Sequence, residues 1–136
     1  MSKDRSLSTA IHILVSLAHN EGNLVNSEEL ARGLCTNPGL VRRVLSKLSQ
    51  AGFIETVKGQ SGGSRLAKRS EDIYLNEIYI ATMDKPLFGS FDKEPYKPCP
   101  VSCNMNTILS GLYDELESHL LEKMKTINLA TLVKKV

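Results

Sequence analysis

Two short amphipathic segments separated by four residues constrain the fold more than any other feature of the sequence. The first, residues 28–34, follows Ser27, whose hydroxyl can cap a helix, and it carries two glutamates in its first turn. The second, residues 39–48, follows Asn37 as a cap and Pro38 at the first helical position. Because the connection is so short, the two helices must be neighbours. The pattern predicts a helix-turn-helix.

The second segment has an apolar face and a polar face. Its apolar stripe consists of Leu40 or Val41, Val44, Leu45 and Leu48. The polar residues between these positions are Arg42, Arg43, Ser46 and Lys47, and Gln50 can join them. When the stripe packs on the first helix, this polar face must point outward. In a helix-turn-helix the second helix enters the major groove, so we expect the polar face to contact a DNA duplex.

A glycine-rich hairpin follows directly. Residues 53–57 and 65–67 look like short strands, and the turn between them contains Gly59, Gly62 and Gly63. The turn matches neither the dinucleotide fingerprint nor the phosphate loop of nucleotide hydrolases. An ordinary hairpin without a ligand is one interpretation. A hairpin after a recognition helix is also typical of a wing, whose bare backbone and cations can approach phosphates or the minor groove.

The distribution of charge favours the second interpretation. Residues 39–69 contain seven lysines and arginines and a single acid, Glu55, although the whole chain has a formal net charge of only +2. A merely solvated face usually carries mixed signs, whereas clustered cations are typical of nucleic-acid binding. The residues that we expect to contact DNA are Ser27, Asn37, Gly39, Arg42, Arg43, Ser46, Lys47, Lys58, Gly59, Gln60, Ser61, Gly62, Gly63 and Arg65.

Helical periodicity also marks the two ends of the chain. A first helix is expected over residues 6–19 with Ser6 as its cap, and a short helix over residues 76–83 with Asn76 as its cap. A proline-rich loop separates the latter from a long helix over residues 104–125. Asn128 is expected to cap a short tail helix that folds back on the core.

The long helix needs a partner for its apolar stripe. Pairing with the same helix of a second subunit is the economical solution, and packing back on its own domain is the alternative. We therefore expect a mainly α-helical fold with a small β-hairpin. Residues 1–83 would form a winged helix-turn-helix DNA-binding domain, residues 84–103 a loop containing prolines and cysteines, and residues 104–136 the dimerisation helix and tail helix.

Composition excludes several other classes. The chain has 136 residues and contains no apolar run of membrane-spanning length, and its first residues do not resemble a signal peptide. We therefore expect a cytoplasmic protein that does not bind or span a membrane. We find none of the usual catalytic motifs and expect no enzyme. His12 and His19 are seven residues apart, which is not a usual metal spacing. A winged-helix adaptor that binds proteins remains an alternative.

Several motifs together resemble the Rrf2 family of bacterial winged-helix transcription regulators. They include the wing at residues 58–67, the stretch Ile73-Tyr74-Leu75-Asn76-Glu77-Ile78 and the ending at residues 126–133, so the resemblance covers essentially the whole chain. Ser64 departs from the family because an aromatic residue is usual at this wing position. The resemblance implies a homodimer, paired through the long helix, that binds a palindromic operator in double-stranded DNA, most plausibly as a repressor.

The cysteines decide what kind of member this is. Cluster-binding members resemble one another in holding three cysteines in the loop before the long helix, and some members sense nitric oxide, iron–sulfur status or cysteine metabolism. Here that loop has only Cys99 and Cys103, while Cys35 belongs to the helix-turn-helix. A [2Fe-2S] centre needs four ligands. We therefore expect no metal and no cofactor. Incidental thiols, a redox pair formed by Cys99 and Cys103, and an iron–sulfur-sensing regulator are the open alternatives.

Overall fold

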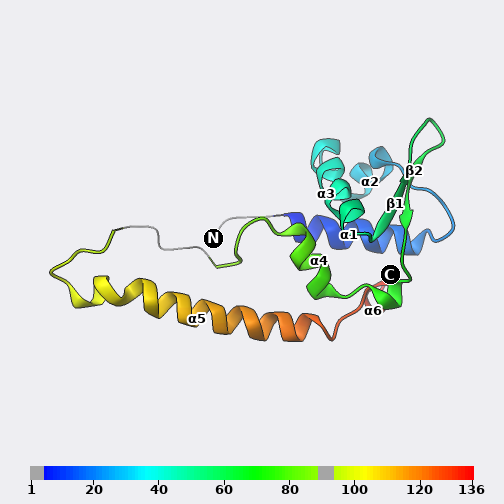
Figure 1. Ribbon diagram of the computed structural model, residues 1–136. Helices are drawn as coiled ribbons and strands as arrows, with labels where there is room; N and C mark the ends of the chain where they lie inside the picture. The colour runs from blue at the N-terminus through cyan, green and yellow to red at the C-terminus, as the bar shows by residue number, and fades with distance from the viewer. Residues whose placement is uncertain (1–4, 89–93) are drawn as a thin grey trace.

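The computed structural model describes residues 5–88 and 94–136, which form a compact helical part with a hairpin and a long C-terminal helix (Figure 1). Residues 1–4 and 89–93, which belong to the expected 1–83 domain and 84–103 loop, lie outside the described residues. The elements are α1 Ser6–His19, α2 Ser27–Leu34, α3 Pro38–Gln50, β1 Ile54–Val57, β2 Gly63–Leu66, the 3-10 helix η1 Ser70–Asp72, α4 Leu75–Thr82, α5 Pro100–Met124 and α6 Leu129–Val133. The expected fold class is confirmed.

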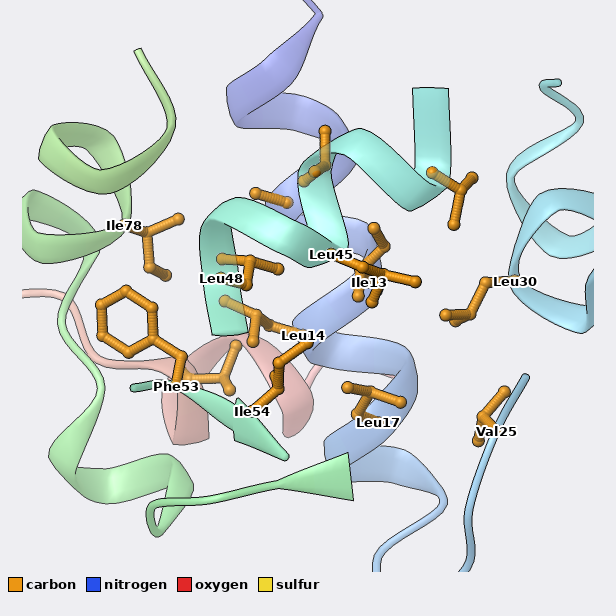
Figure 2. Close-up of a cluster of buried hydrophobic side chains, with 14 of the residues drawn as sticks. Ile13, Leu14, Leu17, Val25, Leu30, Leu45, Leu48, Phe53, Ile54 and Ile78 are labelled. Atoms are coloured by element: carbon orange, nitrogen blue, oxygen red, sulfur yellow. The ribbon is translucent and has the colours of Figure 1, made fainter. Parts of the chain in front are cut away.

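Helix α1 is the centre of the hydrophobic core. Its side chains Ile13, Leu14 and Leu17 belong to one buried cluster with Leu45 and Leu48 of α3 (Figure 2). The core is completed by residues of β1, α4 and α6. Burying one such side chain contributes about 1.5–3 kcal/mol. The apolar period predicted the span of α1, residues 6–19, correctly. The predicted cap was wrong, because Arg5 occupies the N-cap position and Ser6 is a buried residue of the first turn.

The helix-turn-helix forms as predicted, with one correction. Asn26, not Ser27, caps α2, because its side-chain oxygen accepts a hydrogen bond from the Glu29 amide at 2.8 Å. Cys35 ends α2 in the left-handed conformation at a φ of 52°. Asn37 caps α3 by accepting a 2.8 Å hydrogen bond from the Leu40 amide, as expected. The turn between α2 and α3 is therefore fixed at both ends.

The wing is an antiparallel hairpin in which Thr56 pairs with Ser64. Strand β2 begins at Gly63, two residues earlier than predicted, because Gly63 and Ser64 still pair with Val57 and Thr56 of β1. The loop before α2 adds a bridge to this strand. The Val25 amide donates to the Ser64 carbonyl at 3.0 Å, and the Ser64 amide donates to the Val25 carbonyl at 2.8 Å. A Cβ on Gly63 would lie 2.8 Å from the Val25 backbone, and one on Gly62 would lie against the Val57 carbonyl. Both glycines thus permit close packing of backbones.

Helices α4 and α6 both pack on α1. Helix α4 contacts α1 and α3, as expected for the short helix after the wing. Its predicted cap was wrong, because α4 begins at Leu75 and Tyr74 occupies the N-cap position. Helix α6 packs on α1, and Asn128 caps it through a 3.0 Å hydrogen bond from the Thr131 amide, as predicted.

Helix α5 has 25 residues and begins four residues before the predicted start, because Pro100 stands in its first turn and Cys99 at its N-cap. In Figure 1 it extends well beyond the compact part of the molecule. Among the described residues, no helix is long and apolar enough to cross a lipid bilayer.

Side-chain contacts join the middle of α5 to α4 and to the segment that follows α4. The Phe88 and Tyr113 rings stack with centroids 4.9 Å apart, and the Tyr79 hydroxyl donates to Glu117 Oε1 at 3.3 Å. Burial raises the pKa of Tyr79 above its ordinary value of 10.0, and the charge of Glu117 and the hydrogen bond to it act in the same direction.

Candidate nucleic-acid interface

A cleft of about 680 Å³ lies between α3 and the wing. It is lined by eight of the residues that the sequence assigned to DNA contact. They are Ser27, Arg42, Ser46, Lys58, Gly59, Gln60, Gly62 and Gly63. These residues come from α2, α3 and the hairpin, so folding brings three successive elements together around one cleft.

Helix α3 supplies one wall of the cleft. Arg42 and Ser46 stand one turn apart, and Ser49 and Gln50 continue the same surface toward the end of the helix. These side chains are exposed, whereas Val41 and Val44 are buried on the core side of α3. Arginine and glutamine side chains can each make paired hydrogen bonds to base edges, so this wall offers the chemistry of direct base reading.

The wing supplies the opposite wall. Lys58 and Gln60 line the cleft on either side of Gly59, which has a φ of +111° and faces open space where a side chain would project. Any side chain at Gly59 would be strained by this φ, so the turn requires glycine for its backbone conformation. Lys58 is exposed and carries a charge on a flexible stem that suits a phosphate contact. The acid on the described lining is Glu28, at the start of α2.

Six of the predicted residues do not line the cleft, namely Asn37, Gly39, Arg43, Lys47, Ser61 and Arg65. Asn37 is occupied by capping α3, and a Cβ on Gly39 would lie 3.2 Å from the Asn37 side chain. Both therefore have a structural task. Arg43 is exposed on α3, and Ser61 is exposed at the wing tip. The structure does not bring these two side chains into the cleft with Arg42 and Lys58.

Lys47 turns away from the cleft toward α4. Its ammonium donates to the Thr82 carbonyl at 3.2 Å and pairs with Asp84 Oδ2 at 2.5 Å. Its side chain is only 20% exposed. Spacing along α3 could not separate Lys47 from Ser46, because the difference depends on where α4 packs.

Arg65 lies on the other face of the wing. In the hairpin register it pairs with Glu55, and its Nε donates to Glu55 Oε2 at 3.1 Å. Successive residues of a strand point to opposite faces. Because Ser64 lines the cleft, Arg65 faces a separate depression that Lys68 and Arg69 also line.

Sequence reasoning missed several polar residues of the cleft, among them Asn26, Ser49 and Thr56. Ser49 continues the helical face of Arg42 and Ser46 at spacings of seven and three residues, which could have identified it. Thr56 belongs to a strand whose inner face is defined by its pairing with Ser64. No local signal in the sequence reports that pairing.

The two loop cysteines lie at the start of α5. Cys99 caps the helix, and its sulfur accepts a hydrogen bond from the Ser102 amide at 3.4 Å. The Cys103 thiol is 3.5 Å from the Lys97 carbonyl and can donate to it. Cys35 is exposed at the helix-turn-helix, on a different element. Across residues 5–88 and 94–136, no three His, Cys, Asp or Glu side chains gather as metal ligands. This donor set does not fit a protein-bound iron–sulfur cluster.

Comparison with known proteins agrees with this architecture. A family model described as Rrf2, iron-dependent transcriptional regulator, matches residues 4–135. The HTH-type protein YwnA of Bacillus subtilis is 32% identical over 82% of this chain and 81% of its own length. The HTH-type transcriptional regulator NsrR of Bacillus licheniformis is 29% identical over 83% of this chain and 84% of its own length.

Solved structures share the fold as well. The crystal structure of a transcriptional regulator from Lactobacillus plantarum matches with a TM-score of 0.81 at 24% sequence identity. The match covers 94% of this chain and 87% of that regulator's chain. The wing sequence, the helix-turn-helix, the long C-terminal helix and these matches agree along almost the whole length. The chain therefore belongs to the Rrf2 family, and it is a DNA-binding transcriptional regulator and not an enzyme.

Proposed function

We propose that the protein is a homodimeric repressor that binds a palindromic operator in double-stranded DNA and acts in the cytoplasm. The observation that carries this proposal is the single cleft lined by Arg42 and Ser46 on one wall and Lys58 and Gln60 on the other. In it, a helix that can read base edges stands beside a wing that can bind phosphates. The two kinds of contact are those that a sequence-specific DNA-binding protein needs.

The apolar stripe of α5 supports pairing with a second copy of the chain. Ile108 is 55% exposed, Leu112 47% and Leu116 43%, at steps of four residues along one face. The side of the helix with Tyr113 and Glu117, about 100° round from this face, is already used for contacts within the chain. Leucine and isoleucine at helical spacing on a long helix are typical of a helix–helix interface.

This proposal assigns a different role to each part of the chain. Residues 1–83 would bind DNA, residues 84–103 would connect, and residues 104–136 would pair the subunits, with α6 returning to pack on α1. The proposal needs no cofactor and no metal. An adaptor function would need a cleft suited to a protein partner, and the cations and bare glycines of this cleft suit phosphates better.

Selection from a random duplex library tests the proposal. The purified full-length protein should enrich duplexes that contain two inverted half-sites, and it should sediment as a dimer. The logarithm of the affinity for an enriched duplex should fall linearly with the logarithm of the salt concentration. Enrichment of no common sequence, or binding without salt dependence, would refute the proposed function.

A response to thiol oxidation is a second proposal, favoured by the placement of Cys99 and Cys103. Both cysteines stand at the start of the proposed dimerisation helix, and the Ser102 amide donates to the Cys99 sulfur. A peroxide would accept two electrons and two protons from the two thiols as a disulfide forms. Treatment with hydrogen peroxide should change operator affinity in the wild type and leave the Cys99→Ser/Cys103→Ser variant unchanged. Equal responses of the two proteins would remove this proposal.

A further inference from the structure

The ammonium group of Lys47 is held by two acceptors that lie outside the recognition helix. It donates to the Thr82 carbonyl at 3.2 Å and to Asp84 Oδ2 at 2.5 Å. The Lys47 side chain is 20% exposed, whereas the Asp84 side chain is 74% exposed. Lys47 would have to give up both bonds before it could contact a duplex in the cleft.

The first acceptor, the Thr82 carbonyl, lies at the end of α4, where the chain is buried. Thr82 is fully buried, and its hydroxyl donates to the Ile78 carbonyl at 2.8 Å. A cation at the C-terminus of a helix also interacts favourably with the helix dipole. Lys47 therefore ties the last turn of α3 to the last turn of α4.

The second acceptor belongs to the segment that leads toward α5. Four residues after Asp84, the Phe88 ring stacks on Tyr113 of α5 at an interplanar angle of 11°. The Tyr79 hydroxyl joins α4 to Glu117 of the same helix. Lys47 thus joins α3 both to α4 and to the segment that follows it, and each of these two contacts α5 through its own side chain.

We propose that Lys47 is a positioning residue that sets the direction of the recognition helix relative to α5. The inference rests on the proposed function, because only a dimer paired through α5 has two recognition helices to align. The direction of each α3 then fixes the distance between the two helices, and the preferred spacing of operator half-sites follows from that distance. In this role Lys47 contributes to operator choice without touching DNA.

The variants Lys47→Met, Asp84→Asn and their combination test the inference. Duplexes enriched by the wild type from a random library are rebuilt with their half-sites one or two base pairs closer or further apart. Each single variant should lower affinity for the best spacing about fivefold, and the double variant should be no weaker than Lys47→Met. Both single variants should also discriminate less between spacings. Their salt slopes should equal that of the wild type.

Arg42→Met is the matched control, because Arg42 is a cation of the same helix that lines the cleft. It should lower affinity and change the preferred bases of the half-sites, because Arg42 stands on the base-reading wall, and it should leave the preferred spacing between half-sites unchanged. Asp84 is mostly exposed, so Asp84→Asn keeps the test valid even if Lys47→Met fails to fold.

Three results would overturn the inference. A flattened salt slope in Lys47→Met with no effect of Asp84→Asn would make Lys47 a direct phosphate contact. Lower thermal stability with an unchanged preference among spacings would reduce Lys47 to a support of the fold. If the wild type enriched duplexes but showed no preference among half-site spacings, Lys47 could not act by setting that spacing. A wild type that enriches no duplex at all would instead refute the proposed function.

Discussion

At the scale of single residues, charge alone does not identify a DNA contact, because three cations of the expected interface have different environments. Lys58 lines the cleft, Arg65 pairs with Glu55 on the other face of the wing, and Lys47 is bound to α4. All three look equivalent in the sequence. Their difference arises from strand register and from the packing of α4, neither of which has a local signal.

Arg42 and Arg65 offer a matched pair for testing this distinction. Arg42→Gln should lower affinity for an enriched duplex at least about tenfold and change the preferred bases, because it removes a side chain from the α3 wall. Arg65→Gln removes the same charge from the opposite wing face and should change affinity less than about threefold. Competition between enriched and random duplexes measures both effects. Equal losses in the two variants would contradict the assignment of the cleft.

Gly63 is predicted to be required for folding more than for DNA contact. A Cβ there would lie 2.8 Å from the Val25 backbone, so Gly63→Ala should lower the free energy of unfolding by about 1–3 kcal/mol. Gly33→Ala is the control, because a Cβ at Gly33 would meet no atom within 4 Å and the residue stands inside α2. There alanine should be neutral or stabilise by up to about 1 kcal/mol. Urea denaturation compares the two, and equal stabilities would contradict the packing argument.

At the scale of elements, periodicity and caps predicted most of the helices, and the errors lie mainly at the ends of elements. The apolar period predicted α1 with its correct bounds and α3 to within two residues at each end, and Asn37 and Asn128 act as predicted. The start of β2 was wrong because the pairing with β1 continues to Gly63, a residue that the sequence had assigned to the turn. The α3 wall of the cleft was predictable from the face of that helix, whereas the inner face of the wing depends on the register of the hairpin.

The junction of α4 and α5 should make stability depend on alkaline pH. The pKa of Tyr79 is raised by burial and by Glu117, so the folded protein keeps this proton to a higher pH than the unfolded chain does. The stabilisation is complete below the ordinary pKa of 10.0, and it is lost as pH rises toward the folded pKa. Tyr79→Phe should therefore change how the free energy of unfolding varies with pH above this value, because the contribution of the tyrosine proton is removed.

Tyr74→Phe serves as the control for that experiment, because Tyr74 is an exposed tyrosine at the start of α4. Denaturant unfolding from neutral pH to the highest pH at which the wild type still folds measures both variants, provided that this range passes the ordinary pKa of 10.0. If Tyr79→Phe kept the full pH dependence of the wild type, the contact between α4 and α5 would not be its cause.

At the scale of the whole molecule, the proposed function requires two DNA-binding surfaces on one particle. A single cleft offers few cations, and the salt dependence of affinity reports how many phosphates are contacted. Pairing through α5 would double that number and join two half-sites. Oligomeric state and salt dependence should therefore change together when the apolar stripe of α5 is interrupted.

Leu112→Glu places a charge in the centre of this stripe, where a paired helix would bury it. The variant should sediment as a monomer, and its salt slope on an enriched duplex should fall to about half of the wild-type value, since each phosphate contact contributes about 0.9 to the slope. Ser118→Glu adds the same charge to an exposed position on another side of α5 and should remain a dimer with the full slope. A dimeric Leu112→Glu protein would place the subunit interface elsewhere. A monomer with an unchanged slope would mean that one subunit already makes every phosphate contact, so that pairing through α5 adds nothing to DNA binding.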